Sequence, residues 1–348
     1  MIICLAACQN EELDRKKGSI RVSAFAYEGQ VVSRATADGY TDFANTYGAT
    51  SSSPVVMPFW AVSGANSYDF TASYNGEGWS SYCHLEPDLY HPYHFYSYLP
   101  QSITADGVGV TFTSSPATLT FGNVPAVLGK DLLVSVATTS GDSSTDNPYD
   151  QYIDGSDNQP LTFRMDHVLA KLTFSFTNPT EKPFSDLRRI VIKAVEVKTA
   201  WSQRWNIVCT MGNSLSYNIE YSDGEPVSHT IENNSSQTIN GKPVTGYLVE
   251  QKAYNESAST PFGSCYLVPN DGHAVAIRAT YDVYDKNGTL IRADEKAVNN
   301  SLAITLKNTL GYNPIEAGTE YKVNVQVIPD YLYVLGDDDA GNALQIGS

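Results

Sequence analysis

Apolar and polar residues alternate along much of this chain in short runs that turn residues interrupt. In the clearest run, Val168, Ala170, Leu172, Phe174 and Phe176 occupy every second position, and Asn178-Pro179 follows. Residues 275–283 and 321–327 repeat the same spacing. A period of two is the spacing of a half-buried strand, whereas amphipathic helical spacing is scarce. The pattern therefore predicts an all-β protein built as a sandwich or a barrel.

Turn-forming residues divide the expected strands into domains. Asp285 to Gly288 contains Asn-Gly, the strongest short signal for a hairpin turn, directly after one alternating run. Residues 138–159 are polar and turn-rich, and they cannot bury much surface. We expect them to close a first domain, residues 19–160, and we expect a second domain over residues 161–348. Residues 9–18 are interpreted as a tether.

Composition and charge exclude several classes of protein. Of 348 residues, 42% are hydrophobic and 17% are charged, which is enough to build a core. The 22 basic and 38 acidic residues give 22 − 38 = −16, which argues against nucleic-acid binding because that requires clustered Lys and Arg. No apolar run approaches the ~18 residues of a membrane helix.

Neither the cysteines nor the histidines form a convincing metal site. The cysteines outside the first eight residues are odd in number and lack CxxC spacing, so we expect buried thiols: Cys83, Cys209 and Cys265. His91 and His94 are three positions apart, which places them on different faces of a strand. A run of aspartates between 142 and 157 lacks the ligand order of a calcium loop. We therefore expect no metal and no cofactor.

Three motifs typical of enzymes are absent from the sequence: it contains no G-x-S-x-G, no P-loop and no H-E-x-x-H. We therefore expect a protein that is not an enzyme. A cluster of aromatic residues offers another activity, because exposed rings can stack on sugars. The alternative hypothesis is thus a glycan-binding surface lipoprotein whose platform comprises Trp79, Tyr82, Tyr90, Tyr93, Phe95, Tyr96 and Tyr98.

The first eight residues resemble a bacterial lipoprotein signal. Leu5-Ala6-Ala7-Cys8 is similar to a lipobox, in which the cysteine thiol receives the lipid. The acidic segment that follows resembles a signal for export to the cell surface. Residues 1–8 lack the basic region and the full apolar core of a signal peptide, so we expect a precursor with a longer N-terminus. The resemblance implies an outer-membrane, surface-exposed lipoprotein anchored through Cys8.

Five segments, in order, resemble landmarks of the fimbrillin family, the type V pilins of Bacteroides-like bacteria. They extend over most of the chain, and their order and spacing are more specific than any one of them. The third matches the family's F-x-x-x-H-x-L-A-K-L-x-F pattern. The segments are His91–Pro100, Asp131–Ala137, Phe163–Phe174, Tyr266–Pro269 and Ala317–Val323. The resemblance implies two transthyretin-like β-sandwich domains in tandem and a function as a fimbrial subunit or pilus-associated adhesin.

The resemblance also implies an assembly mechanism. In fimbrillins an arginine-specific surface protease cuts after the first strand, and a strand from a neighbouring pilin subunit fills the groove that is left. Arg34-Ala35 fits the cleavage position. The removable strand would carry Ile20, Val22, Ala24 and Ala26 on one face. The expected partners are other pilin subunits, this protease, the outer membrane and a surface receptor.

The C-terminal tail is the candidate donor strand. Leu332 and Val334 could present the donor face, or they could complete the sandwich of their own domain. Both interpretations stay open. The sequence therefore does not decide whether the protein is a stalk subunit or a tip subunit of the pilus.

Overall fold

The structure is a computed structural model that describes most of the chain between residues 49 and 328 and three short segments outside it. The described ranges are 21–27, 40–41, 49–81, 94–137, 160–181, 185–199, 204–211, 215–222, 227–254, 256–269, 274–303, 307–308, 311–312, 315–328 and 345–347. Within them the regular structure is strands and a single 3₁₀-helix, η1 (Gln101–Asp106). The expectation of an all-β sandwich fold is confirmed.

The strands form two compact units, each of which combines separate stretches of sequence. The first unit contains the described residues of Met1–Val124, Asp131–Leu169 and Trp205–Tyr221, and the second contains those of Pro125–Lys130, Ala170–Arg204 and Ser222–Ser348. The expected domains, 19–160 and 161–348, are each continuous in sequence. The two groupings differ because the first unit also contains residues from beyond 160, up to Leu169 and from Trp205 to Tyr221.

An eight-stranded sheet forms one layer of the first unit, in the order β2-β1-β11-β10-β6-β3-β4-β5. Its strands are β1 (Arg21–Tyr27), β2 (Tyr40–Thr41), β3 (Val55–Ser63), β4 (Asn66–Tyr74), β5 (Trp79–Ser81), β6 (His94–Leu99), β10 (Leu133–Ala137) and β11 (Pro160–His167). Apart from the parallel pair of β1 and β11, the pairs are antiparallel.

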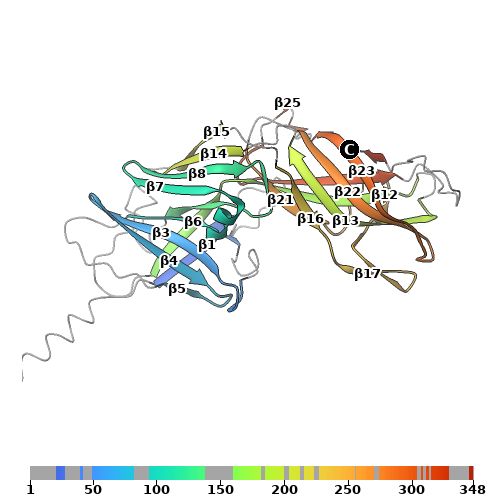
Figure 1. Ribbon diagram of the computed structural model, residues 1–348, viewed down its shortest axis with the longest axis horizontal. Coiled ribbons are helices and arrows are strands. Elements are labelled where there is room, and N and C mark those ends of the chain that lie inside the picture. Colours follow the sequence, from blue (N-terminus) through green and yellow to red (C-terminus); the bar gives the residue numbers. More distant parts are fainter. Residues whose placement is uncertain are drawn as a thin grey trace, which may run out of the picture. The chain divides into compact units, whose positions relative to one another are not determined.

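A four-stranded sheet covers one face of this layer, in the order β15-β14-β8-β7 (Figure 1). Its strands are β7 (Gly109–Ser114), β8 (Ala117–Pro125), β14 (Arg204–Met211) and β15 (Leu215–Ser222). Aromatic rings join the two layers: Trp60 stacks on Phe112 with ring centroids 4.7 Å apart, and Tyr98 meets Phe121 edge-on at 5.5 Å. The other face of the eight-stranded sheet carries a second buried cluster that includes Phe59, Phe95 and Phe163.

The second unit packs two larger sheets face to face. One has the order β27-β26-β12-β21-β9, with β20 also paired to β12. The other has the order β16-β13-β22-β23, with β19 also paired to β13. The strands of the first sheet are β9 (Val127–Leu128), β12 (Ala170–Pro179), β20 (Glu250–Lys252), β21 (Gly263–Leu267), β26 (Glu320–Ile328) and β27 (Gln345–Gly347). Those of the second are β13 (Arg188–Thr199), β16 (His229–Glu232), β19 (Tyr247–Leu248), β22 (Ala274–Asp285) and β23 (Leu290–Ala303).

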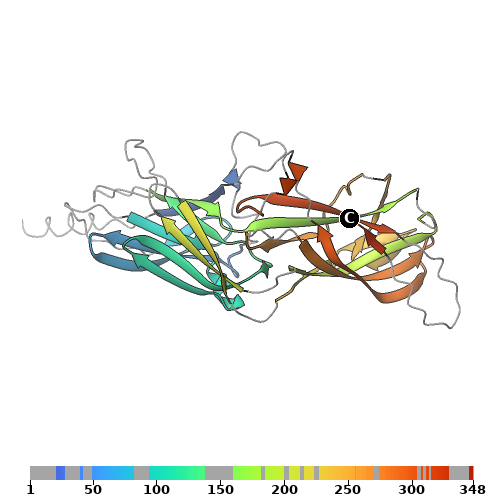
Figure 2. The same cartoon turned by 90° about the horizontal axis from the view of Figure 1, so that it is seen from above.

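Two small hairpins complete the second unit: β17 (Ser236–Ile239) with β18 (Lys242–Thr245), and β24 (Lys307–Asn308) with β25 (Gly311–Tyr312). Figure 2 shows the same strands at right angles to the view of Figure 1. The β17–β18 hairpin packs Ile239 and Val244 over Val191, a buried residue of β13. The turn of this hairpin is Asn240-Gly241, both with positive φ, which suits the mirror-image turns that join antiparallel strands.

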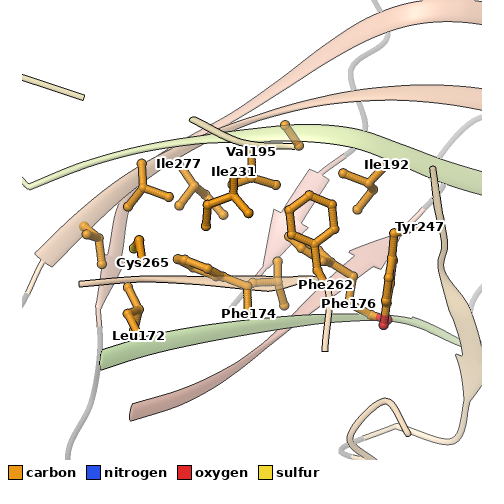
Figure 3. Packing of buried hydrophobic residues seen from close by; sticks show 14 of the residues in the cluster. Leu172, Phe174, Phe176, Ile192, Val195, Ile231, Tyr247, Phe262, Cys265 and Ile277 are labelled. Carbon is orange, nitrogen blue, oxygen red and sulfur yellow. The ribbon is translucent and has the colours of Figure 1, made fainter. Parts of the chain in front are cut away.

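Alternation in the sequence accounts for the core of the second unit. Leu172, Phe174 and Phe176 of β12 are fully buried, whereas the residues between them are partly exposed. Figure 3 shows these side chains facing Ile192, Val195 and others from the opposing sheet. Every second residue of β22 from Val275 to Val283 joins the same cluster. The strands predicted at 275–283 and 321–327 are confirmed as parts of β22 and β26.

Candidate functional site

The N-terminal strand β1 lies near one end of the eight-stranded sheet. It pairs in parallel with β11 over seven residues, from Arg21 opposite Pro160 to Tyr27 opposite Asp166. On its other side β2 contributes two residues, Tyr40 and Thr41. The predicted strand at the start of the first domain is therefore present, and nearly all of its ladder is formed with β11.

The ladder pairs the even-numbered positions of β1 with odd-numbered positions of β11. Val22 is opposite Leu161, Ala24 is opposite Phe163, and Ala26 is opposite Met165. Phe163 and Met165 are fully buried, and the ring of Phe163 lies 5.6 Å from that of Phe59. Because paired residues share a face of a sheet, the even-numbered positions of β1 adjoin the core face of β11.

A short, partly buried hydrogen bond between two side chains holds β11 to β10 on its other side. Asp131 Oδ2 lies 2.5 Å from His167 Nδ1, and Asp131 Oδ1 accepts a hydrogen bond from Leu132 N at 2.8 Å. The backbone continues the link, because Val168 N donates to Leu132 O at 2.8 Å. This contact fixes the beginning of β10 against the end of β11, and so it supports the strand that carries β1.

The Asp131–His167 pair was not predicted from the sequence. A signal was present, however, since Asp131 opens one of the fimbrillin-like segments and His167 is the histidine of another. Neither segment by itself indicates a partner for its polar residue. The structure shows that the two segments meet at these two side chains.

The aromatic platform expected for glycan binding is contradicted at Phe95, Tyr96 and Tyr98, which are all buried. Both faces of β6 are covered. Phe95 belongs to the cluster on one side of the sheet, and Tyr96 contacts Phe112 at 5.5 Å on the other. Trp79 is half-buried and packs 5.3 Å from Tyr74. Tyr82, Tyr90 and Tyr93 lie outside the described residues.

Several predicted site residues also lie outside the described part of the chain. They are the lipidation site Cys8, the strand residue Ile20, the cleavage site Arg34-Ala35, and the donor residues Leu332 and Val334. Cys209 and Cys265 are described, and burial raises the pKa of each thiol to about 12. They are therefore inert core residues. Within the described residues, no three His, Cys, Asp or Glu side chains come together as a metal site.

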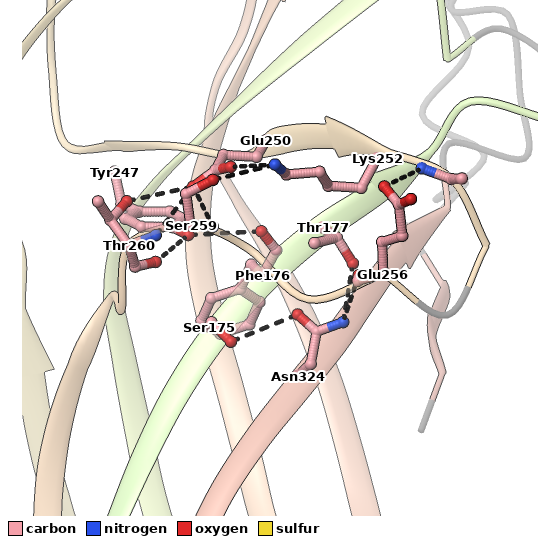
Figure 4. A network of polar contacts seen from close by, with 11 residues as sticks. Ser175, Phe176, Thr177, Tyr247, Glu250, Lys252, Glu256, Ser259, Thr260 and Asn324 are labelled. Atoms are coloured by element: carbon pink, nitrogen blue, oxygen red, sulfur yellow. Dashed lines mark hydrogen bonds and ion pairs between the residues drawn. The ribbon is translucent and has the colours of Figure 1, made fainter.

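A network of polar contacts in the second unit holds the loop that contains Ser259 and Thr260 against Glu250 (Figure 4). Glu250 Oε1 accepts hydrogen bonds from the backbone N–H groups of Ser259 at 2.8 Å and Thr260 at 3.1 Å, and Lys252 Nζ lies 3.2 Å from Oε2. The loop leads directly to Phe262, whose ring centroid lies 5.4 Å from that of the buried Phe176. Partial burial raises the pKa of Glu250, but the hydrogen bonds and Lys252 outweigh it and lower that pKa to about 2.

The lowered pKa of Glu250 predicts a dependence of stability on pH. Because the pKa of the folded protein is below its ordinary value of 4.5, the stabilisation is complete above that value and is lost as the pH falls towards 2. We expect Glu250→Gln to cost the second unit about 1–2 kcal/mol at pH 7, after allowance for solvent screening. The variant should also flatten the loss of stability on acidification.

Urea unfolding of the wild type and the variant, repeated at several pH values from neutral to acid, tests this prediction. Glu232→Gln is the matched control, because Glu232 is an exposed residue of the same unit. Coincident pH profiles for wild type and Glu250→Gln would show that the network does not stabilise the fold.

Comparisons with known proteins agree with the fold. No protein-family model and no curated protein matches the sequence. Among solved structures, a fimbrial protein from Bacteroides vulgatus is similar, with a TM-score of 0.50, 11% identity, and coverage of 94% of this chain and 98% of that one. A candidate cell adhesion protein from Bacteroides uniformis matches with a TM-score of 0.40, 12% identity, and coverage of 94% and 97%. The first likeness shows that the chain shares the fold of a bacterial fimbrial protein.

The described part of the chain contains no helix that is long and apolar enough to cross a membrane.

Proposed function

We propose that this protein is a fimbrial subunit or a pilus-associated adhesin, exported as a lipoprotein through Cys8 to the outer membrane and the fimbrium. The position of β1 carries the proposal. This strand precedes Arg34 in the sequence, yet it is hydrogen-bonded mainly to β11, which lies far beyond Arg34. Cleavage at Arg34-Ala35 would therefore leave β1 attached to its sheet by non-covalent contacts alone.

Removal of β1 would create a site for another strand. The ladder edge of β11 would become free, beside the core positions Phe163 and Met165. An incoming extended segment would add main-chain hydrogen bonds to this edge and would place alternate side chains over the core, as in donor-strand complementation. The shared fold of the Bacteroides vulgatus fimbrial protein also supports the proposal.

The energies involved are large enough to drive exchange. Ladder hydrogen bonds contribute about 0.5–1.5 kcal/mol each, and full burial of a valine or isoleucine side chain contributes about 1.5–3 kcal/mol. The gross total for β1 is on the order of 5–10 kcal/mol, which is an upper value. Because a whole domain is typically stable by about 5–15 kcal/mol, a unit without β1 would be marginal until a partner strand replaced it.

We expect an arginine-specific protease to cut the folded protein mainly at Arg34-Ala35, because proteases need exposed and adaptable backbone. Arg21 should resist, since its backbone lies in the ladder with β11. The fragment that begins at Ala35 should then form oligomers. N-terminal sequencing and size-exclusion chromatography before and after digestion measure both effects.

Arg34→Ala should stay uncut at this position and monomeric under the same treatment, whereas Arg15→Ala should behave as wild type. A protected Arg34 would contradict the proposal. So would a cut protein that stays monomeric and retains β1.

A further inference from the structure

The strand β15 (Leu215–Ser222) forms one edge of the four-stranded sheet in the first unit. It is hydrogen-bonded to β14 on one side, and no strand of the described chain pairs with its other side. An edge of this kind presents a row of backbone N–H and C=O groups that another strand can join. Natural proteins usually protect such edges with charges, proline, bulges or a covering segment.

The core-facing side of β15 is apolar but incompletely covered. The rings of Trp205 and Tyr221 meet edge-on at 5.7 Å, and Trp205 shares its face of β14 with the buried Ile207 and Cys209. The odd-numbered positions of β15 therefore lie on the core side. Yet Tyr217 is 37% exposed and Tyr221 is 51% exposed. They are two of the five large hydrophobic residues that are exposed in the described chain.

The long edge strand of the second unit is better protected than β15. The long edge strand β23 carries Arg292, Asp294, Glu295 and Lys296, and its pairing with β22 is interrupted by register shifts. β7, at the opposite edge of the same sheet, has no charged residue or proline either, but its aromatic side chain Phe112 is packed against Trp60. In contrast to β23, β15 contains one charged residue, Glu220, and no proline or lysine.

We propose that β15 is a self-association edge through which two copies of this chain pair antiparallel about a two-fold axis at Asn218. Its sequence is self-complementary about this point. Tyr217 of one copy comes opposite Ile219 of the other, Leu215 comes opposite Tyr221, and Glu220 comes opposite Ser216. The apolar side chains of both copies then lie on one face of a continuous sheet, where pairs of an aromatic and a β-branched residue stabilise antiparallel strands. The contact is isologous and closes as a dimer.

Charge selects this register over the neighbouring one. With a strand rise of about 3.4 Å per residue and a strand spacing of about 4.8 Å, an axis at Asn218 places the two Glu220 residues roughly 14 Å apart. An axis at Ile219 would bring them to roughly 8 Å. The chain already carries a net charge of −16, so the wider spacing is favoured. For the same reason, added salt should strengthen the dimer by screening the repulsion between the two copies.

Analytical ultracentrifugation of the full chain over a micromolar concentration series tests the surface. We expect a monomer–dimer equilibrium that shifts towards dimer with salt. Tyr217→Lys, an inward-pointing charge on an edge strand, should weaken the dimer at least about tenfold. Tyr68→Lys is the control, because Tyr68 has a similar exposure on β4, and it should dimerise as wild type. A wild type that stays monomeric, a dimer indifferent to Tyr217→Lys, or open higher oligomers would overturn the proposal.

Disulfide trapping tests the register and does not depend on the folding of the lysine variant. In a background with Cys4, Cys8 and Cys83 changed to serine, Asn218→Cys should form an intermolecular disulfide on mild oxidation, because the two Cα atoms would lie about 4.5–5.5 Å apart. Ser216→Cys, an equally exposed position of the same strand, should form none, since its Cα atoms would be roughly 14 Å apart. Equal trapping of both, or of Ser216→Cys alone, would overturn the proposed axis. This pairing needs no proteolysis, so a failure here is distinct from a failure of β1 exchange.

Discussion

Replacing Phe174 with alanine should destabilise the second unit by about 3–5 kcal/mol, the range measured for deletion of a buried phenylalanine ring. Phe174 is fully buried on the central strand β12, between β21 and β26. The strands on both sides restrict collapse around the cavity, so the loss of packing should be near the top of that range. For a unit of ordinary stability, about 5–15 kcal/mol, this change alone approaches unfolding.

Chemical denaturation followed by circular dichroism measures this effect. Leu290→Ala is the control, because Leu290 is 49% exposed in the same unit, and surface changes usually stay within about 0.5 kcal/mol. Equal midpoints for wild type and Phe174→Ala would mean that the core is not packed as described.

Replacing Gly246 with alanine should cost about 2–5 kcal/mol, from backbone strain and overpacking together. Gly246 has φ +129°, and a Cβ atom there would lie 2.7 Å from Val191 Cγ1 and 2.9 Å from the carbonyl oxygen of Ile192. Its N–H also donates to Ser235 O at 2.9 Å. Since the backbone of β13 cannot move away without breaking its own ladder, the clash cannot be relieved cheaply.

Gly241→Ala separates the two contributions. Gly241 also has positive φ, +76°, but no atom lies within 4 Å of the added Cβ. Its cost should therefore be the conformational part alone, about 1–2 kcal/mol. Thermal unfolding of both variants gives the comparison. A Gly246→Ala protein as stable as Gly241→Ala would show that the segment before β19 is not pressed against β13.

The two proposed interfaces use opposite layers of the first unit. Exchange of β1 would alter the eight-stranded sheet, which pairs β1 with β11, whereas self-association through β15 would extend the four-stranded sheet. A fibre subunit with both edges could join chains along one edge and associate laterally along the other. The trapping experiment on β15 and the digestion experiment on Arg34 examine the two edges independently.

Local alternation in the sequence determined the strands and their buried faces. The run from Ala170 to Phe176 predicts β12 and its core side, because a strand that is half buried must place its apolar residues two apart. Asn-Gly dipeptides likewise mark the turns at Gly241 and Gly288, both of which have positive φ. The overall β character followed from these local patterns, whereas the resemblance to the fimbrillins rested on five family-like segments in order along the sequence.

Only the tertiary structure decided which strands pair. Alternation identifies the apolar side of a strand but not its neighbours, because main-chain hydrogen bonds are the same for every sequence. Hence the parallel pairing of β1 with β11, and the place of the β14–β15 hairpin in the first unit, could not be predicted. The same holds for the rings of β6, since a single strand does not show whether one or both of its faces will be covered. The side-chain hydrogen bond of Asp131 and His167, which joins residues 36 positions apart, likewise exists only after β10 and β11 have paired.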